Sequence, residues 1–160
     1  MMKKWLALAL LVVVLDQLTK ALAVDLLSYA EQLVVFPVFN FTLLYNPGAA
    51  FSFLGDASGW QRWFFVAVST GAAIFLTIWL YRLKPEQILL ALAVALVLGG
   101  AVGNLIDRLW LGYVVDFIQV HYRDSYFPAF NIADSAISVG AVLLIWDSLF
   151  AHKESDKHDD

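Results

Sequence analysis

The 160-residue chain contains no cysteine, which excludes disulfides, thiolate metal ligands and a cysteine nucleophile. Histidine is scarce, with three in the whole chain, so acid–base or covalent chemistry must depend largely on hydroxyl and carboxyl side chains. Charge is scarce too, at 15% of residues, and the Lys and Arg residues are too scattered to form the basic patch that nucleic-acid binding requires. We therefore expect no nucleic-acid partner.

Apolar residues are abundant instead, at 61%, and such a composition is typical of an integral membrane protein. Four apolar runs approach the roughly 20 residues that a helix needs to cross a bilayer. They cover residues 5–24, 63–81, 88–106 and 132–150. No linker or repeat divides the chain, so we predict one domain over residues 1–160, an all-α bundle of four transmembrane helices that ends in a disordered polar tail at 152–160.

The orientation follows from the positive charges, which accumulate on the cytoplasmic side of membrane proteins. Lys and Arg precede the first run, fill the loop between the second and third, and follow the fourth, whereas residues 25–59 contain none. Both termini are therefore predicted to be cytoplasmic, and the loop after the first helix extracytoplasmic.

The N-terminus allows a second interpretation, because two lysines, an apolar run and the sequence Ala21-Leu22-Ala23 resemble a cleavable signal peptide. Against this, Asp16, Gln17 and Lys20 interrupt the stretch before the supposed cleavage site. Removal would also leave an odd number of spans. We favour a retained helix.

The outer loop is rich in β-branched and aromatic residues from Glu31 to Tyr45 and closes with the turn signal Asn46-Pro47-Gly48. We predict short strands there, so the bundle should carry a small β-rich extracytoplasmic region. Its apolar side chains could shape a groove for an extended lipid-bearing substrate, or the sheet could merely plug the end of the bundle. Composition does not separate these two roles.

Two carboxylates are predicted to meet at the outer face. Asp116 follows the third helix, which runs outward, and Asp134 lies in the first turn of the fourth, which runs inward. The apolar, aromatic segment 112–130 between them is expected to lie at the membrane interface as a partial helix or loop. Intramembrane and interfacial acids are costly, so a functional role competes seriously with a structural one.

Two neighbouring carboxylates cannot both ionise comfortably, so one proton is shared between them. The ionised acid can then take a proton from water while the protonated one supports a carbonyl oxygen, which is the chemistry of aspartic proteases. This chemistry needs no metal, and we expect no metal and no other cofactor. Each acid also has a structural alternative: Asp134 suits a helix N-cap, and Asp116 could pair with Arg108 or Arg123.

Other polar and small residues have their own interpretations. Asp16 and Lys20 are one helical turn apart and are expected to pair, with substrate positioning as the alternative. Arg108 could hold a phosphate or a substrate carbonyl, or simply pair with Asp107. The spacing of small residues from 99 to 103 favours tight helix packing. His121 has no acid and nucleophile at motif spacing, and we interpret it as an interface residue.

Five short segments occur in the order seen in lipoprotein signal peptidases (signal peptidase II), and the chain resembles that family over nearly its whole length. The segments are Asp16-Gln17-Leu18-Thr19-Lys20, Asn46-Pro47-Gly48-Ala49-Ala50-Phe51, Gly103-Asn104-Leu105-Ile106-Asp107-Arg108, Val114-Val115-Asp116-Phe117 and Phe130-Asn131-Ile132-Ala133-Asp134-Ser135. The resemblance implies a monomeric aspartic endopeptidase of the bacterial inner membrane, with its active site at the outer, periplasmic face. It would remove signal peptides from prolipoproteins, cutting before the diacylglyceryl-modified cysteine in contact with membrane lipids. The cyclic peptide globomycin would inhibit it.

The same resemblance assigns roles to individual residues. It implies that Asp116 and Asp134 form the catalytic dyad and that Asp16 and Lys20 organise the site. The substrate pocket would be lined by Asn46, Gly48, Asn104, Arg108, Asn131 and Ala133.

Two other classes of function stay open from the residues alone. Intramembrane acids with a lysine also mark ion or proton pathways, although the second and third spans are nearly bare of ionisable groups, which argues against a transporter. A non-catalytic scaffold, in which Asp116 pairs with an arginine, predicts that Asp116→Asn lowers stability rather than activity.

Overall fold

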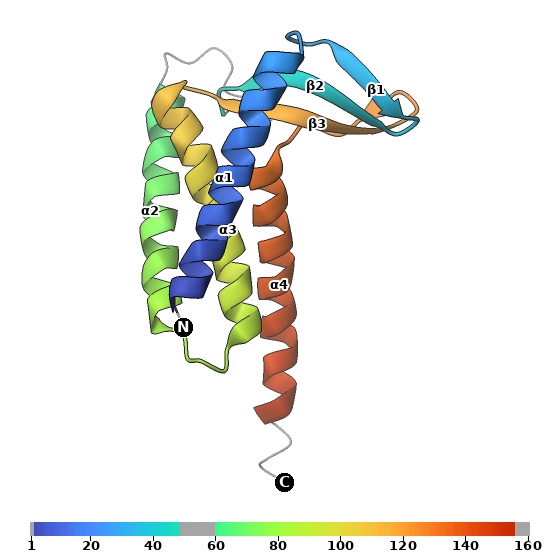
Figure 1. The fold of residues 1–160 in the computed structure, drawn as a ribbon. Helices are drawn as coiled ribbons and strands as arrows, with labels where there is room; N and C mark the ends of the chain where they lie inside the picture. Colours follow the sequence, from blue (N-terminus) through green and yellow to red (C-terminus); the bar gives the residue numbers. More distant parts are fainter. Residues whose placement is uncertain (1, 49–59, 156–160) are drawn as a thin grey trace.

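The computed structural model describes residues 2–48 and 60–155, with side chains described as far as residue 150. Positions 49–51 of the Asn-Pro-Gly segment and positions 156–160 of the expected tail lie outside the described residues. The described chain is a bundle of helices that carries a small sheet at one end (Figure 1).

The predicted membrane helices are all present in the described chain. They are α1 (Met2–Leu26), α2 (Trp60–Arg82), α3 (Ile88–Trp110) and α4 (Ile132–Ser155). Each is long and apolar enough to cross a membrane, which confirms the four predicted spans. Helix α4 continues through residues 152–155, the first part of the segment expected to be a disordered tail. No proline or glycine stops the helix there.

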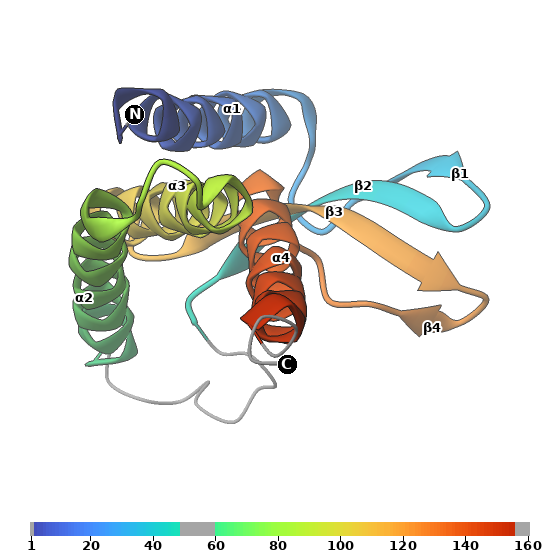
Figure 2. The same ribbon diagram turned by 90° about the horizontal axis from the view of Figure 1, so that it is seen from below.

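Helix α3 is central to the bundle. It packs against α1, α2 and α4, and Figure 2 shows these three helices around it. Small residues make the close approach possible: Gly99 lies against Val12 of α1, and Gly100 lies against Ala133 of α4. The prediction that these glycines serve helix packing is therefore confirmed.

The predicted β-rich region is an antiparallel sheet at the end of the bundle opposite the start of α1 and the end of α4 (Figure 1). Its strands, in spatial order, are β1 (Gln32–Phe36), β2 (Phe39–Asn46), β3 (Val114–Tyr122) and β4 (Ser125–Tyr126). The strands predicted within residues 31–45 are confirmed as the β1–β2 hairpin. In the register of β2 with β3, Leu44 lies opposite Asp116.

The expectation of a partial helix or loop at 112–130 is wrong, because this segment contains the strand β3, followed by the short β4. The edge of β2 that faces away from β1 needs partners for its backbone groups, and β3 provides them. The β-branched residues Val114, Val115, Ile118 and Val120 suit a pleated strand better than a helix. This pairing ties Asp116 to the loop that follows α1.

The contact of α3 with α4 gives a test by a matched pair of glycine substitutions. In Gly100→Ala the new Cβ would overlap the Ala133 carbonyl oxygen and lie 2.7 Å from Cγ1 of Ile137. Because a backbone oxygen cannot move aside cheaply, we expect a loss of about 1–3 kcal/mol of stability. The control is Gly71→Ala on α2, where a Cβ meets no heavy atom within 4 Å. Thermal unfolding in detergent should show a lower Tm for the first variant and no decrease for the second; equal Tm values would contradict this packing.

Candidate active site

The two candidate acids come from different elements that meet where the sheet joins the bundle. Asp116 is in β3 and is 3% exposed, and Asp134 lies half-buried in the first turn of α4. The position of Asp134 follows from how α4 begins. The Asn131 side-chain oxygen accepts the Asp134 N–H at 2.9 Å, and the Asp134 carboxylate accepts the Asn131 N–H at 3.3 Å. This reciprocal pair has the form of a capping box, so Asn131, not Asp134, is the N-cap.

Asn131 also reaches the other acid. Its side-chain Nδ2 donates to Oδ1 of Asp116 at 2.8 Å, while its backbone N–H donates to Oδ2 of Asp134. One fully buried residue therefore contacts both carboxylates and brings them to the same place. The sequence-based prediction that the two acids are neighbours agrees with this geometry.

Each remaining carboxylate oxygen accepts one amide hydrogen bond. Asn46 Nδ2 donates to Asp116 Oδ2 at 3.1 Å, and Asn104 Nδ2 donates to Asp134 Oδ1 at 2.8 Å. Among the described residues Asp116 makes no ion pair with Arg108 or Arg123, so the structural alternative of an arginine partner is not observed. Neutral donors thus hold both acids, and lone pairs stay available for a proton or a water.

Burial, together with the nearby Asp134 carboxylate, raises the pKa of Asp116 from 3.8 to about 7. Hydrogen bonds from Asn46 and Asn131 and the positive charge of Lys20 act in the opposite direction. The burial effect is the larger one. Asp116 is therefore poised to exchange a proton near neutral pH, which is where general acid–base catalysis is most effective.

A second cluster of charges lies behind these acids. Lys20 Nζ is 2.8 Å from a carboxylate oxygen of Asp16, which confirms the predicted pair, and also 2.8 Å from Asp107. Lys20 further donates to Oδ1 of Asn104 at 3.0 Å. Asp16 accepts the Ala133 N–H at 2.9 Å and thereby fixes the start of α4.

Asp107 and Arg108 do not pair with each other in the described structure. The Asp107 carboxylate binds Lys20 instead, since it lies on the α1 side of α3. The Arg108 guanidinium lies 5.1 Å from the ring centroid of Phe65, and its Nε is buried without a hydrogen-bond partner among the described residues. Sequence reasoning did not foresee that Arg62 holds this end of α3, by donating to the carbonyl oxygens of Arg108 and Leu109 at 2.8 and 2.7 Å.

Two further predicted site residues occupy conformationally restricted places. Gly48 has φ +96°, donates its N–H to the Asn46 side chain at 2.9 Å, and has the ring of Phe65 where a Cβ would project. Ala133 is fully buried between α3 and α4. Within the described chain, Ala133 thus lies behind the acids, whereas Gly48 lies next to Asn46.

His121 is stacked on Tyr126 with ring centroids 5.0 Å apart, at the β3–β4 turn and away from both acids. In residues 2–48 and 60–150 no three His, Asp or Glu side chains gather in a way that could hold a metal ion.

The arrangement is that of a multi-pass membrane protein with a paired-carboxylate site at one end of its bundle, which is the class of the membrane aspartic peptidases. The sequence profile of the signal peptidase (SPase) II family matches residues 8–150. The chain is 53% identical to the lipoprotein signal peptidase of Acinetobacter baumannii over 156 residues, covering 98% of this chain and 89% of that protein. It is 57% identical to the lipoprotein signal peptidase of Pseudomonas aeruginosa over 153 residues, covering 94% and 90%.

Solved structures agree with this assignment. A bacterial membrane enzyme superimposes with a TM-score of 0.82 at 34% identity, covering 92% of this chain and 94% of the other, and a second gives 0.80 at 33%, covering 92% and 88%. The chain belongs to the signal peptidase II family, the aspartic endopeptidases that cleave the signal peptides of prolipoproteins.

The electrostatics of the acid pair can be tested by titrating the Asp116 carboxyl carbon by ¹³C NMR in detergent. We expect the pKa of Asp116 to be about 7 in the unsubstituted protein. In Asp134→Asn it should fall, because a negative charge that disfavours ionisation is removed, but it should stay above 3.8, because burial is the larger cause. An unchanged or higher pKa in the variant would show that the two carboxylates do not interact.

Proposed function

We propose that Asp116 and Asp134 are the catalytic dyad with which this protein hydrolyses the signal peptide bond. The observation that carries the proposal is the contact of Asn131 with both carboxylates, through its side-chain amide to Asp116 and its backbone N–H to Asp134. The donors around the pair are neutral amides, which stabilise a carboxylate without fixing the number of protons on the pair. A dyad that shares one proton needs this freedom.

The reaction uses the two acids in opposite protonation states. The ionised carboxylate takes a proton from a water molecule, and the water oxygen forms a bond to the carbonyl carbon of the scissile peptide. The protonated carboxyl donates a hydrogen bond to the carbonyl oxygen as negative charge develops there. When the C–N bond breaks, a proton passes from the dyad to the leaving nitrogen. The pair titrates as a unit, so neither acid is assigned the shared proton.

The residues around the dyad fall into two groups. Asn46, Gly48 and Arg108 would contact the substrate, because Asn46 donates to Asp116, Gly48 follows Asn46 in the same turn, and the Arg108 side chain is partly exposed on the last turns of α3. The others are all buried and would shape the pocket from behind: Asn104, Asn131, Ala133, Asp16 and Lys20. In this arrangement Asp16 and Lys20 organise the site and do not touch the peptide.

The substrate would be a prolipoprotein that carries a diacylglyceryl cysteine, cut just before that residue. Its lipid chains would rest in the outer leaflet of the inner membrane, near the end of the bundle that carries the sheet. Both termini would be cytoplasmic, since Lys3, Lys4, Arg82 and Lys84 lie at the opposite end. We further propose that the protein acts as a monomer and that a cyclic peptide of the globomycin type occupies the dyad as a blocked substrate.

The dyad is tested by cleavage of a diacylglyceryl-modified prolipoprotein with purified protein in detergent. Asp116→Asn and Asp134→Asn should each lower kcat by about 10³-fold or more, because neither variant can both accept and donate the required protons. Tm is measured in parallel, so that a folded but inactive protein is distinguished from an unfolded one. If Asp116→Asn mainly lowers Tm and keeps its activity, Asp116 is a scaffold residue and the dyad is wrong.

The topology is tested through the absence of cysteine, which makes single-cysteine variants simple to interpret. Glu31 and Lys84 are both exposed and lie on opposite sides of the membrane in the proposed orientation. In spheroplasts a membrane-impermeant maleimide should label Glu31→Cys, and it should label Lys84→Cys only after lysis. The reverse pattern would invert the proposed orientation.

A further inference from the structure

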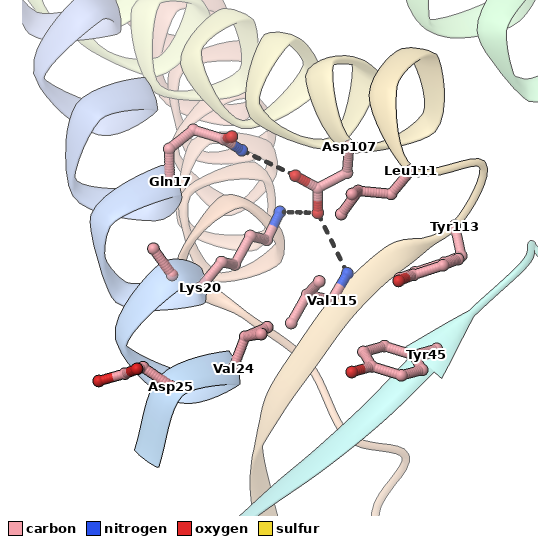
Figure 3. A pocket seen from close by; sticks show the side chains of 10 residues that line it. Gln17, Lys20, Val24, Asp25, Tyr45, Asp107, Leu111, Tyr113 and Val115 are labelled. Atoms are coloured by element: carbon pink, nitrogen blue, oxygen red, sulfur yellow. Dashed lines mark hydrogen bonds and ion pairs between the residues drawn. The ribbon is translucent and has the colours of Figure 1, made fainter. Parts of the chain in front are cut away.

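Asp107, on the last turns of α3, is a buried acid for which the dyad mechanism has no direct use. It is 3% exposed, and its carboxylate makes three contacts, shown in Figure 3. It accepts from Gln17 Nε2 at 2.8 Å, lies 2.8 Å from Lys20 Nζ, and accepts the backbone N–H of Val115 at 3.1 Å. One carboxylate therefore links α1, α3 and β3.

The contact with Val115 acts on the backbone one residue before Asp116. In the register of the sheet Val115 lies opposite Tyr45 of β2, and the short β4 pairs only with the far end of β3. The polar groups of Val115 are satisfied by side chains: Asp107 accepts its N–H, and Asn131 Nδ2 donates to its carbonyl oxygen at 3.2 Å. The backbone next to Asp116 is thus held from two directions.

The contact with Lys20 acts on the other acid. Lys20 donates to Oδ1 of Asn104, which also accepts from Asn131 at 3.3 Å. With its oxygen engaged in this way, the Asn104 amide must direct Nδ2 toward Asp134, to which it donates at 2.8 Å. The orientation of the Asn104 side chain therefore depends on the ammonium group that Asp107 shares.

We infer that Asp107 is a positioning residue for the dyad, which fixes Asp116 by holding the Val115 peptide and orients Asn104 toward Asp134 by holding Lys20. The inference rests on the proposed catalytic role of Asp116 and Asp134. Asp107 itself touches neither acid and has no part in the proton transfers. A loss of Asp107 should slow the chemical step and leave substrate binding nearly intact, because small displacements of reacting groups cost rate more than affinity.

The charges around Asp107 allow it to be replaced without orphaning a buried ion. Lys20 contacts two carboxylates, so in Asp107→Asn it keeps Asp16 as its partner at 2.8 Å. The substituted amide has nearly the same volume and keeps one oxygen acceptor. Asp107→Ala removes the acceptor as well, so it tests the complete loss of the contacts to Val115 and Lys20.

A cavity of about 470 Å³ beside this network supplies the matched control. Gln17, Lys20, Asp107 and Val115 line it, and so does the exposed Asp25 (Figure 3). Asp25→Asn is the same carboxylate-to-amide change in the same cavity. It touches neither the Val115 peptide nor Lys20 in the described contacts.

The experiment measures kcat, KM and Tm for cleavage of a diacylglyceryl-modified prolipoprotein by the full-length protein in detergent. We expect kcat to fall about 10-fold in Asp107→Asn and about 100-fold in Asp107→Ala, with KM changed less than about 2-fold and kcat unchanged in Asp25→Asn. A purely structural role would reduce the folded fraction and Tm instead, without a change in kcat per folded molecule.

The outcomes separate the inference from the proposed function. If Asp116→Asn is inactive while Asp107→Asn and Asp107→Ala keep the unsubstituted kcat, the positioning role is wrong and the dyad stands. If Asp116→Asn remains active, the dyad is wrong regardless of Asp107. A loss that appears in KM alone also overturns the inference. If Asp107→Ala does not fold, Asp107→Asn decides, because it keeps both the volume and the pairing of Lys20 with Asp16.

Discussion

A carboxylate that is removed from water must be given hydrogen-bond donors, and this requirement shapes the end of the bundle where the sheet begins. Asp16, Asp107 and Asp116 are almost fully buried there, and Asp134 is half-buried. The donors come from elements far apart in the sequence, so satisfying the acids fixes how those elements meet. They are Gln17 and Lys20 of α1, Asn46 of β2, Asn104 of α3, Val115 of β3, and Asn131 and Ala133 at the start of α4.

The four acids divide into two pairs with different solvation. Asp16 and Asp107 share the ammonium group of Lys20, which lies 2.8 Å from each carboxylate. Asp116 and Asp134 accept hydrogen bonds from amides alone in the described contacts. The first pair suits a fixed framework, and the second suits a site whose proton count changes during a reaction. The side chains of Asn104 and Asn131 lie between the two pairs. The ammonium group of Lys20 is therefore close to Asp116 and Asp134 but makes no ion pair with them in the described contacts.

Much of the fold could be predicted from the sequence, because long apolar runs, scattered positive charges and the β-branched run at 31–45 are local signals. The pairing of Asp116 with Asp134 was also predictable, since both follow from which side of the membrane each helix ends on. The strand β3 could not be recognised locally. Its apolar residues are equally compatible with a helix or loop at the membrane interface. The strand is favoured only because the edge of β2 needs a pairing partner, which becomes visible in three dimensions.

The contacts of Asp107 and Asn131 were missed for a related reason. Asp107 stands next to Arg108 in the sequence, but adjacent residues on a helix point in different directions, and the partner on α1 becomes visible only in three dimensions. Asp134 was considered as the N-cap of α4, whereas Asn131 three residues earlier takes that role. Sequence spacing alone does not fix the residue at which a helix starts.

The capping box at the start of α4 serves both the helix end and the proposed dyad. The hydrogen bonds between Asn131 and Asp134 that satisfy the free amides of a helix end also place Asp134, and Asn131 bridges it to Asp116. Fraying of a single helical turn would therefore separate the proposed catalytic acids while the rest of the bundle stays intact. The lifetime of a site built on these acids would be governed by the local opening of the first turn of α4, a far smaller event than the unfolding of four helices.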